Sequence, residues 1–168
     1  WASVVSKKIA SGANVIVLDV KYGAGAFIKT KEDAKSLADL MIKIGAKLNR
    51  KISAVISSME QPLGTHIGNS LEIIESIEFL KGNCNKDLYE IVFEITSYTL
   101  VSACLAKDYN EAKKMADEAI KSGRALQKLR EIIRAQGGNE ACVEDYNLFN
   151  VGKNKFELKA SSSGYVSK

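Results

Sequence analysis

The chain has 168 residues, of which 46% are hydrophobic and 26% charged, and its formal net charge is +4. This length and composition suit one globular domain with a substantial core. No apolar run approaches the ~20 residues of a membrane span, and the lysines alternate with carboxylates instead of forming a basic tract, which argues against membrane insertion and nucleic-acid binding.

A helix is predicted at the start of the chain. Within residues 2–10, Val5 and Ile9 fall on one helical face, while Ser3 and Lys7 share the opposite face. Two polar groups thus project together and could form a fork for a small planar ligand, because a hydroxyl donates or accepts and an ammonium stabilises an anion. The pattern alone favours a solvated helix face over such a fork.

Two strands and a helix between them are predicted next. The runs NVIVLDVKY (14–22) and ISAVISS (52–58) are short, continuous and rich in β-branched residues, as strands buried on both faces are. Between them, Thr30 begins a capping-box pattern, and an apolar helical stripe runs from Ala34 to Leu48. This order implies parallel strands joined by a right-handed crossover, so we predict the α/β class.

The glycine-rich YGAGAF (22–27) follows the first strand directly. It has neither the third glycine of the dinucleotide fingerprint nor the GK[ST] ending of a nucleotide P-loop. Because α/β proteins place ligands at the carboxyl ends of strands, we nevertheless expect a ligand near Lys21 to Phe27. Lys21 could form a Schiff base, although an ordinary surface lysine is the simpler interpretation.

Residues 58–75, SMEQPLGTHIGNSLEIIE, hold the single proline and the single histidine. His66 has no recognisable partners for a catalytic triad, so we interpret it as structural. Glu72 and Glu75 fall in the first turns of a helix that we expect Asn69 to cap, where the helix dipole favours carboxylates. A proline-fixed turn beside such a carboxylate would also offer carbonyl oxygens to a hard cation.

Helical patterns dominate from residue 68 to the QGGN segment at 136–139, with breaks at Gly82 and Gly123. The tail has less helical character, and the segment KFELKA (155–160) predicts one strand before a serine-rich turn.

The three cysteines, Cys84, Cys104 and Cys142, are widely separated and match neither a metal site nor a disulfide framework. We therefore expect buried thiols and a cytoplasmic protein. The chain lacks an apolar signal segment and an initiator methionine and opens inside a helix-like pattern, so we expect it to be a piece of a longer protein.

Several segments, taken in order, resemble the thymidine and pyrimidine-nucleoside phosphorylases. They are ASVVSKKIASGANVIVLDVKYGAGAF, LADLMIKIG, SSMEQPLGTHIGNSLEIIE, KSGRAL and AQGGN. Enzymes of this family cleave pyrimidine nucleosides with inorganic phosphate and release a free base and a pentose 1-phosphate. The resemblance thus implies a glycosyltransferase that phosphorolyses thymidine, deoxyuridine or uridine, with phosphate as co-substrate.

The resemblance also implies roles for individual residues. The family's helical serine and lysine correspond to Ser3 and Lys7, which would hydrogen-bond the edge of the pyrimidine, and the positive charge of Lys7 would stabilise the departing base. Phe27 would pack against the base. With these roles, the resemblance overrides the solvated-face interpretation of the first helix.

A monovalent cation, potassium, is implied in the QPLG segment. By position, its ligands are the carbonyl oxygens of Leu63 and His66 together with the side chain of Glu75. The family often has a small residue where His66 stands, a departure that leaves a carbonyl ligand unaffected and makes a side-chain role for this histidine less expected.

Other parts of the family pattern lie upstream of anything in this sequence: the glycine- and threonine-rich phosphate signature, the arginine that partners the serine and lysine, and the helical dimerisation domain. The resemblance thus implies no phosphate-binding residue in this chain. We expect residues 1–150 to be the latter part of an incomplete central α/β domain, with a mixed or parallel sheet and flanking helices. Residues 151–168 would begin a C-terminal α+β domain.

We expect the full-length protein to be a homodimer and this chain alone to show little turnover. Two alternatives stay open: a non-catalytic binding or assembly fragment of the same fold, and a relative that transfers a phosphoribosyl group. An upstream phosphate signature would favour the enzyme over the fragment, and use of nucleotides would favour the phosphoribosyltransferase. The sequence does not separate thymidine-restricted from broad pyrimidine specificity.

Overall fold

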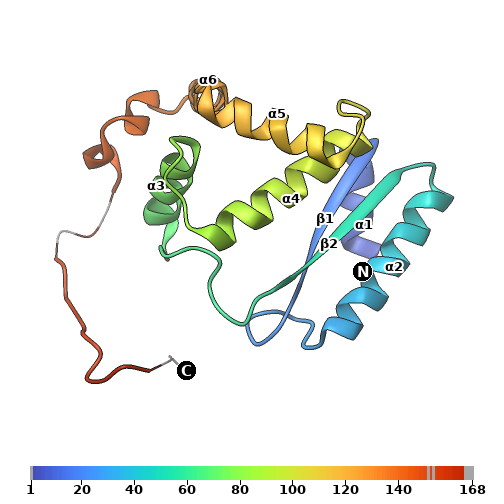
Figure 1. The fold of residues 1–168 in the computed structure, drawn as a ribbon, viewed down its shortest axis with the longest axis horizontal. Helices are drawn as coiled ribbons and strands as arrows, with labels where there is room; N and C mark the ends of the chain where they lie inside the picture. The colour runs from blue at the N-terminus through green and yellow to red at the C-terminus, as the bar shows by residue number, and fades with distance from the viewer. Residues whose placement is uncertain (1, 151, 153, 165–168) are drawn as a thin grey trace.

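The structure is a computed structural model that describes residues 2–150, 152 and 154–164. For residues 2–5 it describes the backbone alone. Its elements alternate at first and are helical afterwards (Figure 1). They are α1 (Ala2–Ala10), β1 (Val15–Tyr22), α2 (Lys31–Lys47), β2 (Lys51–Ser58), α3 (Asn69–Leu80), α4 (Lys86–Ser102), α5 (Tyr109–Lys121), α6 (Arg124–Ala135) and the 3-10 turns η1 (Glu140–Val143) and η2 (Tyr146–Leu148). Among the helices described, none has the length and apolar character needed to traverse a lipid bilayer.

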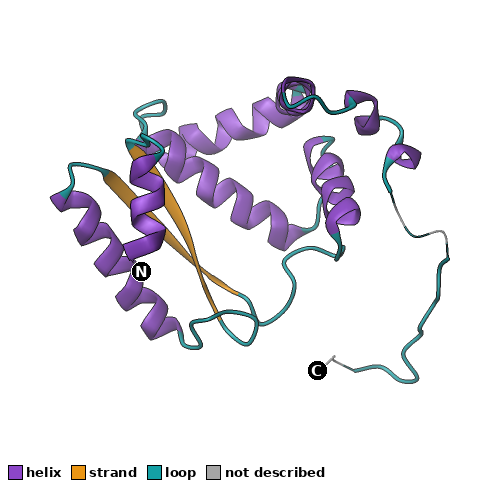
Figure 2. Ribbon diagram, turned by 180° about the vertical axis from the view of Figure 1, so that it is seen from behind, coloured by secondary structure: helices purple, strands orange, loops and turns teal. Residues whose placement is uncertain are grey.

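The two strands form a parallel pair, in register from Val15 opposite Lys51 to Tyr22 opposite Ser58. The helix α2 provides the crossover, so the predicted βαβ unit is confirmed. Helices α1 and α2 lie on one side of the sheet, and α4 covers the other, with α5 packed on α4 (Figure 2). The fold is therefore a helix-rich α/β arrangement around a small parallel sheet, as predicted.

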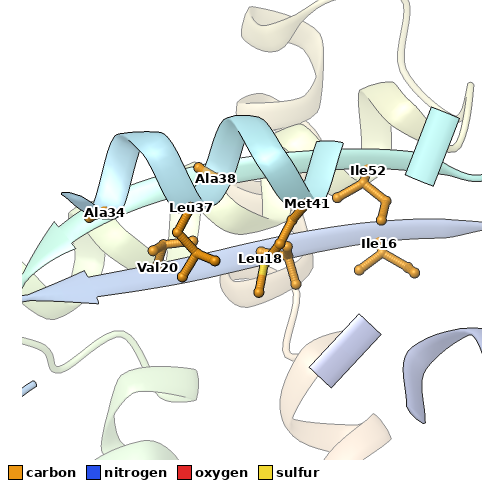
Figure 3. Close-up of a cluster of buried hydrophobic side chains, with 8 residues drawn as sticks. All are labelled: Ile16, Leu18, Val20, Ala34, Leu37, Ala38, Met41 and Ile52. Carbon is orange, nitrogen blue, oxygen red and sulfur yellow. The ribbon is translucent and has the colours of Figure 1, made fainter. Parts of the chain in front are cut away.

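The hydrophobic core lies between the sheet and α2 (Figure 3). Alternate residues of the strands meet residues of α2 spaced three and four apart, which is how a strand face and a helix face bury apolar area together. The members are Ile16, Leu18, Val20, Ala34, Leu37, Ala38, Met41 and Ile52.

The helix starts differ from one another in how they are capped. Thr30 accepts a hydrogen bond from the N–H of Asp33 at 3.1 Å, which confirms the predicted cap of α2. The sequence predicts Asn69 as the cap of α3, but the cap is Gly68. The φ of Gly68 is 126°, a backbone conformation that would be strained in a residue with a side chain. Glu72 Oε1 accepts the Gly68 N–H at 3.0 Å, so a carboxylate inside the helix satisfies the amide of the cap residue, and no side chain in the described part of the chain caps the N–H groups of the first turn.

Two glycines mark the ends of helices, as the sequence predicted. The breaks predicted at Gly82 and Gly123 are confirmed, because each glycine has a positive φ and lies just after the end of a helix.

The strand predicted at 155–160 is wrong. Within the described tail Phe156 and Leu158 are 88% and 86% exposed, and a strand forms only where an edge and an apolar surface are available to it.

The thiols are also more accessible than expected. Cys84 lies in the turn between α3 and α4 and is exposed, as is Cys104 directly after α4, while Cys142 is half-buried. The expectation of buried thiols is therefore wrong, because two of the three cysteines fall in helix-connecting turns that the core does not cover.

Candidate functional site

A cleft of about 580 Å³ opens at the carboxyl ends of the two strands. Its walls come from the end of β1, the glycine-rich segment 23–27, the loop 59–68 and the first turns of α3. A more apolar groove of about 340 Å³ runs beside it, lined by Phe27 and by α2. Lys21, Gly25 and Met59 line both hollows. This is the edge at which parallel sheets place ligands.

Backbone hydrogen bonds join the two loops that frame the cleft. The Met59 N–H donates to the Tyr22 carbonyl at 2.6 Å, and the Gly25 N–H donates to the Met59 carbonyl at 3.0 Å. A Cβ on Gly25 would lie 2.9 Å from that carbonyl oxygen, so only glycine allows this approach. The glycine-rich segment therefore serves to bring the two loops into contact.

Loop amides around the cleft are satisfied by the protein's own carboxylates. These are Glu60 with the N–H of Ala24, Glu72 with that of Gly68 and Glu75 with that of Thr65, at 3.2, 3.0 and 2.8 Å. An anion site at a loop needs such N–H groups to be free to point at the ligand. These three amides are therefore not free to bind an anion.

Glu75 is the most enclosed of these carboxylates, with a side chain that is 14% exposed. Its Oε1 also accepts the Thr65 hydroxyl at 2.9 Å and lies 3.4 Å from His66 Nδ1. The backbone N–H of Thr65 is the largest cause that lowers the pKa of Glu75, so the group carries its charge at neutral pH. A Cβ on Gly64 would lie 2.1 Å from Glu75 Oε2, so a larger residue at this position would force the carboxylate to shift.

Leu63, His66 and Glu75, the residues that the resemblance implies for a cation, all line this cleft. One charged carboxylate among loop carbonyls is chemistry that fits a hard monovalent cation. Among the described residues no group of three or more His, Cys, Asp and Glu side chains could hold a metal ion. The His66 ring lies 3.0 Å from Thr65 Oγ1 and is 43% exposed, so its neighbours are the loop and Glu75.

The residues expected at the base are only partly brought together. Phe27 projects fully into solvent, at 101% exposure, and lines the groove. Lys7 is exposed on α1 and lines neither of the two hollows. The helix α1 runs antiparallel to β1, so its first turn points toward the end of the sheet that carries the cleft (Figure 2). The side chain of Ser3 lies outside the described residues.

Lys21 is not the ordinary surface lysine that the sequence suggested. Its Nζ lies 2.7 Å from Asp19 Oδ2 and donates to Ser57 Oγ at 2.9 Å, and its side chain is only 30% exposed. The sequence carried a signal for the first contact, because residues two apart on a strand share a face. The contact with Ser57 depends on the register of β2, which places that serine opposite Lys21.

Comparisons with known proteins agree with the motifs. The glycosyl transferase family, a/b domain, matches residues 2–126. A pyrimidine-nucleoside phosphorylase of Staphylococcus aureus (strain USA300) is 47% identical over 165 residues, and one of Staphylococcus epidermidis (strain ATCC 12228 / FDA PCI 1200) is 46% identical. Each alignment covers 98% of this chain and 38% of the relative, so the chain spans well under half the length of these curated relatives. The resemblance is thus confirmed, and the chain belongs to the glycosyl transferase family through its α/β domain.

Proposed function

We propose that this chain is part of an enzyme that phosphorolyses pyrimidine nucleosides, releasing the free base and a pentose 1-phosphate. The observation that carries the proposal is the 47% identity, across 98% of the chain, to proteins named pyrimidine-nucleoside phosphorylase. The cleft at the carboxyl ends of the strands supports it, because its lining includes Leu63, His66 and Glu75 and its neighbouring groove includes Phe27.

In the proposed reaction phosphate attacks the anomeric carbon of the pentose while the C–N bond to the base breaks and the base leaves with the bonding electrons. Lys7 places a positive charge near the pyrimidine and stabilises this developing anion, while Ser3 hydrogen-bonds the ring edge. Phe27 packs on the base through its exposed ring. No residue of this chain is assigned to the phosphate.

A potassium ion is proposed as the structural cation, with the carbonyl oxygens of Leu63 and His66 and the Glu75 carboxylate as ligands. It would supply a positive charge that holds the loop carbonyls in place. The Glu75 side chain already fixes this loop through Thr65, so the loop geometry supports the assignment. The protein acts as a cytoplasmic homodimer in this proposal, with residues 1–150 in the central α/β domain and 151–168 beginning the next.

A chimera tests the proposal directly. The segment of the Staphylococcus aureus enzyme that aligns with this chain is replaced by the chain, and release of uracil and thymine is measured with and without phosphate. We expect phosphate-dependent release by the chimera and little turnover by the chain alone. Lys7→Ala should lower kcat/KM by at least about a hundredfold, as loss of one electrostatic group does.

Lys8→Ala is the matched control, because Lys8 is also an exposed lysine of the same helix. A chimera that folds but releases no base would contradict the proposed reaction. Full activity in the Lys7→Ala chimera would contradict only the role of Lys7 and would leave the proposed reaction intact.

A further inference from the structure

Three polar side chains form a closed ring where the strands end. Lys21 pairs with Asp19 Oδ2 at 2.7 Å and donates to Ser57 Oγ at 2.9 Å, and the Ser57 hydroxyl donates to Asp19 Oδ1. Ser57 is 9% exposed, and the side chain of Asp19 is 24% exposed. None of these residues has a role in the reaction proposed above.

The ring lies where the hollows of the site meet. Lys21 lines both the cleft and the groove, Asp19 lines the groove, and Ser57 lines a third hollow of about 680 Å³ between β2 and α4. An ammonium has three N–H donors. Two of them have partners in the ring, and among the described residues no contact uses the third, so it can serve a ligand oxygen.

The charges around the ring select the kind of ligand. The cleft is lined by three carboxylates, those of Glu60, Glu72 and Glu75. The ammonium of Lys21, which also lines it, is already neutralised by Asp19. An anion would therefore meet net negative charge. A neutral hydroxyl group fits better, because it accepts from the ammonium through its oxygen and donates to a carboxylate through its hydrogen.

The shape of the site gives the second half of the argument. The groove reaches Lys21 around the end of β1 from the α2 face of the strands; it is mostly apolar and exposes the aromatic side chain of Phe27, which suits a planar base. A ligand that spans both parts needs a flat apolar end and a hydroxyl-bearing end. A nucleoside has this composition, with the pentose next to the base.

We propose that Asp19, Lys21 and Ser57 form a subsite for the pentose hydroxyls of the nucleoside. Lys21 donates to one hydroxyl oxygen, Asp19 accepts a hydroxyl proton, and Ser57 keeps both side chains in position. This subsite rests on the proposed function, because it takes a pyrimidine nucleoside as the ligand. It predicts that the pentose itself contributes to affinity.

The test compares uridine with uracil, since the two differ by the pentose. Dissociation constants are measured by NMR titration of the whole chain. We expect uridine to bind about tenfold more tightly than uracil, as a hydrogen bond to a charged group provides. In Lys21→Met the dissociation constant of uridine should rise to that of uracil, while the dissociation constant of uracil stays unchanged.

Lys35→Met is the matched control, because Lys35 forms an ion pair with Asp39 at 2.9 Å on an exposed face of α2, and it should keep the preference for uridine. If Lys21→Met fails to fold by circular dichroism, Ser57→Ala should lower the preference in its place. An unchanged preference in a folded Lys21→Met or Ser57→Ala would overturn the subsite.

The outcome separates the subsite from the proposed function. Binding of uracil by the wild-type chain with no gain from the pentose would overturn the subsite and leave the base site intact. Binding of uridine without binding of uracil, lost in Lys21→Met, would support the subsite and contradict the base site. Absence of uridine binding would overturn the subsite.

Discussion

Glu75 and Thr65 are joined by two hydrogen bonds to a single carboxylate oxygen, one from the Thr65 N–H at 2.8 Å and one from its hydroxyl at 2.9 Å. They tie the irregular loop between β2 and α3 to the second turn of α3. Hydrogen bonds to a charged acceptor are stronger than those between neutral groups. The loop carbonyls thus owe their position to a carboxylate that lies ten residues further along the chain.

Gly64→Ala should destabilise the protein through this contact. The new Cβ would lie 2.1 Å from Glu75 Oε2, so the carboxylate must move and its bonds to Thr65 must weaken. We expect the free energy of unfolding, measured with urea, to fall by about 1 kcal/mol, the net contribution of a hydrogen bond. Gly164→Ala is the control, because nothing lies within 4 Å of its added Cβ, and equal stability of the two variants would contradict this contact.

Potassium should stabilise the protein more than sodium does. A cation that binds only the folded chain raises the midpoint of thermal unfolding with its concentration. We expect a higher midpoint when potassium chloride replaces sodium chloride at equal ionic strength, and Glu75→Gln should remove the difference. Glu32→Gln removes an exposed carboxylate from the first turn of α2 and should keep it. The same midpoint in both salts would count against the cation site.

Local patterns explain why much of the fold could be predicted. The continuous β-branched run of β1 is a property of neighbouring residues, although the structure buries only one face of it, with Ile16, Leu18 and Val20, and the cap formed by Thr30 and Asp33 spans three positions. Such signals need no knowledge of distant parts of the chain. The βαβ order, its helix and its parallel pairing followed from them.

Features that depend on distant partners could not be predicted in this way. Ser57 lies 36 residues from Lys21, and only the strand register brings them together. The tail around Phe156 has a strand-like alternation but no edge beside it in the described structure. The grouping of Leu63, His66 and Glu75 followed from a resemblance, because nothing in their spacing shows that a loop would fold back onto a helix.

Phe27→Ala should separate binding from stability. The ring is 101% exposed, so its loss removes almost no buried area, and the free energy of unfolding should change by less than about 0.5 kcal/mol. Affinity for uracil, measured by NMR titration, should fall because the packing surface for the base is gone. Phe156→Ala is the control, since that ring is 88% exposed on the tail, and it should leave affinity unchanged. Equal affinity in both variants would contradict a role for Phe27 at the base.

A second network joins α3 to the segment after α6. The Tyr146 hydroxyl donates to Glu78 Oε1, Asn83 Nδ2 donates to Glu78 Oε2 at 2.8 Å, and Lys81 Nζ donates to the Val143 carbonyl at 2.8 Å. The hydrogen bond from Tyr146 is the largest cause that lowers the pKa of Glu78 below its ordinary value of 4.5. Unlike the loop at Glu75, this network holds one helical segment against another.

Tyr146→Phe should therefore make stability less sensitive to acid. A carboxylate whose pKa is lower in the folded state stabilises that state fully above its ordinary pKa of 4.5, and the contribution is lost as the pH falls through the folded value. We expect Tyr146→Phe to lose about 1 kcal/mol of unfolding free energy at neutral pH and to approach the wild type in acid, in urea titrations at several pH values. Tyr98→Phe, which removes a hydroxyl that makes no hydrogen bond in the described part of the chain, is the control. A deficit in Tyr146→Phe that stays constant from neutral pH to below the folded pKa would show that Glu78 does not respond to this hydroxyl.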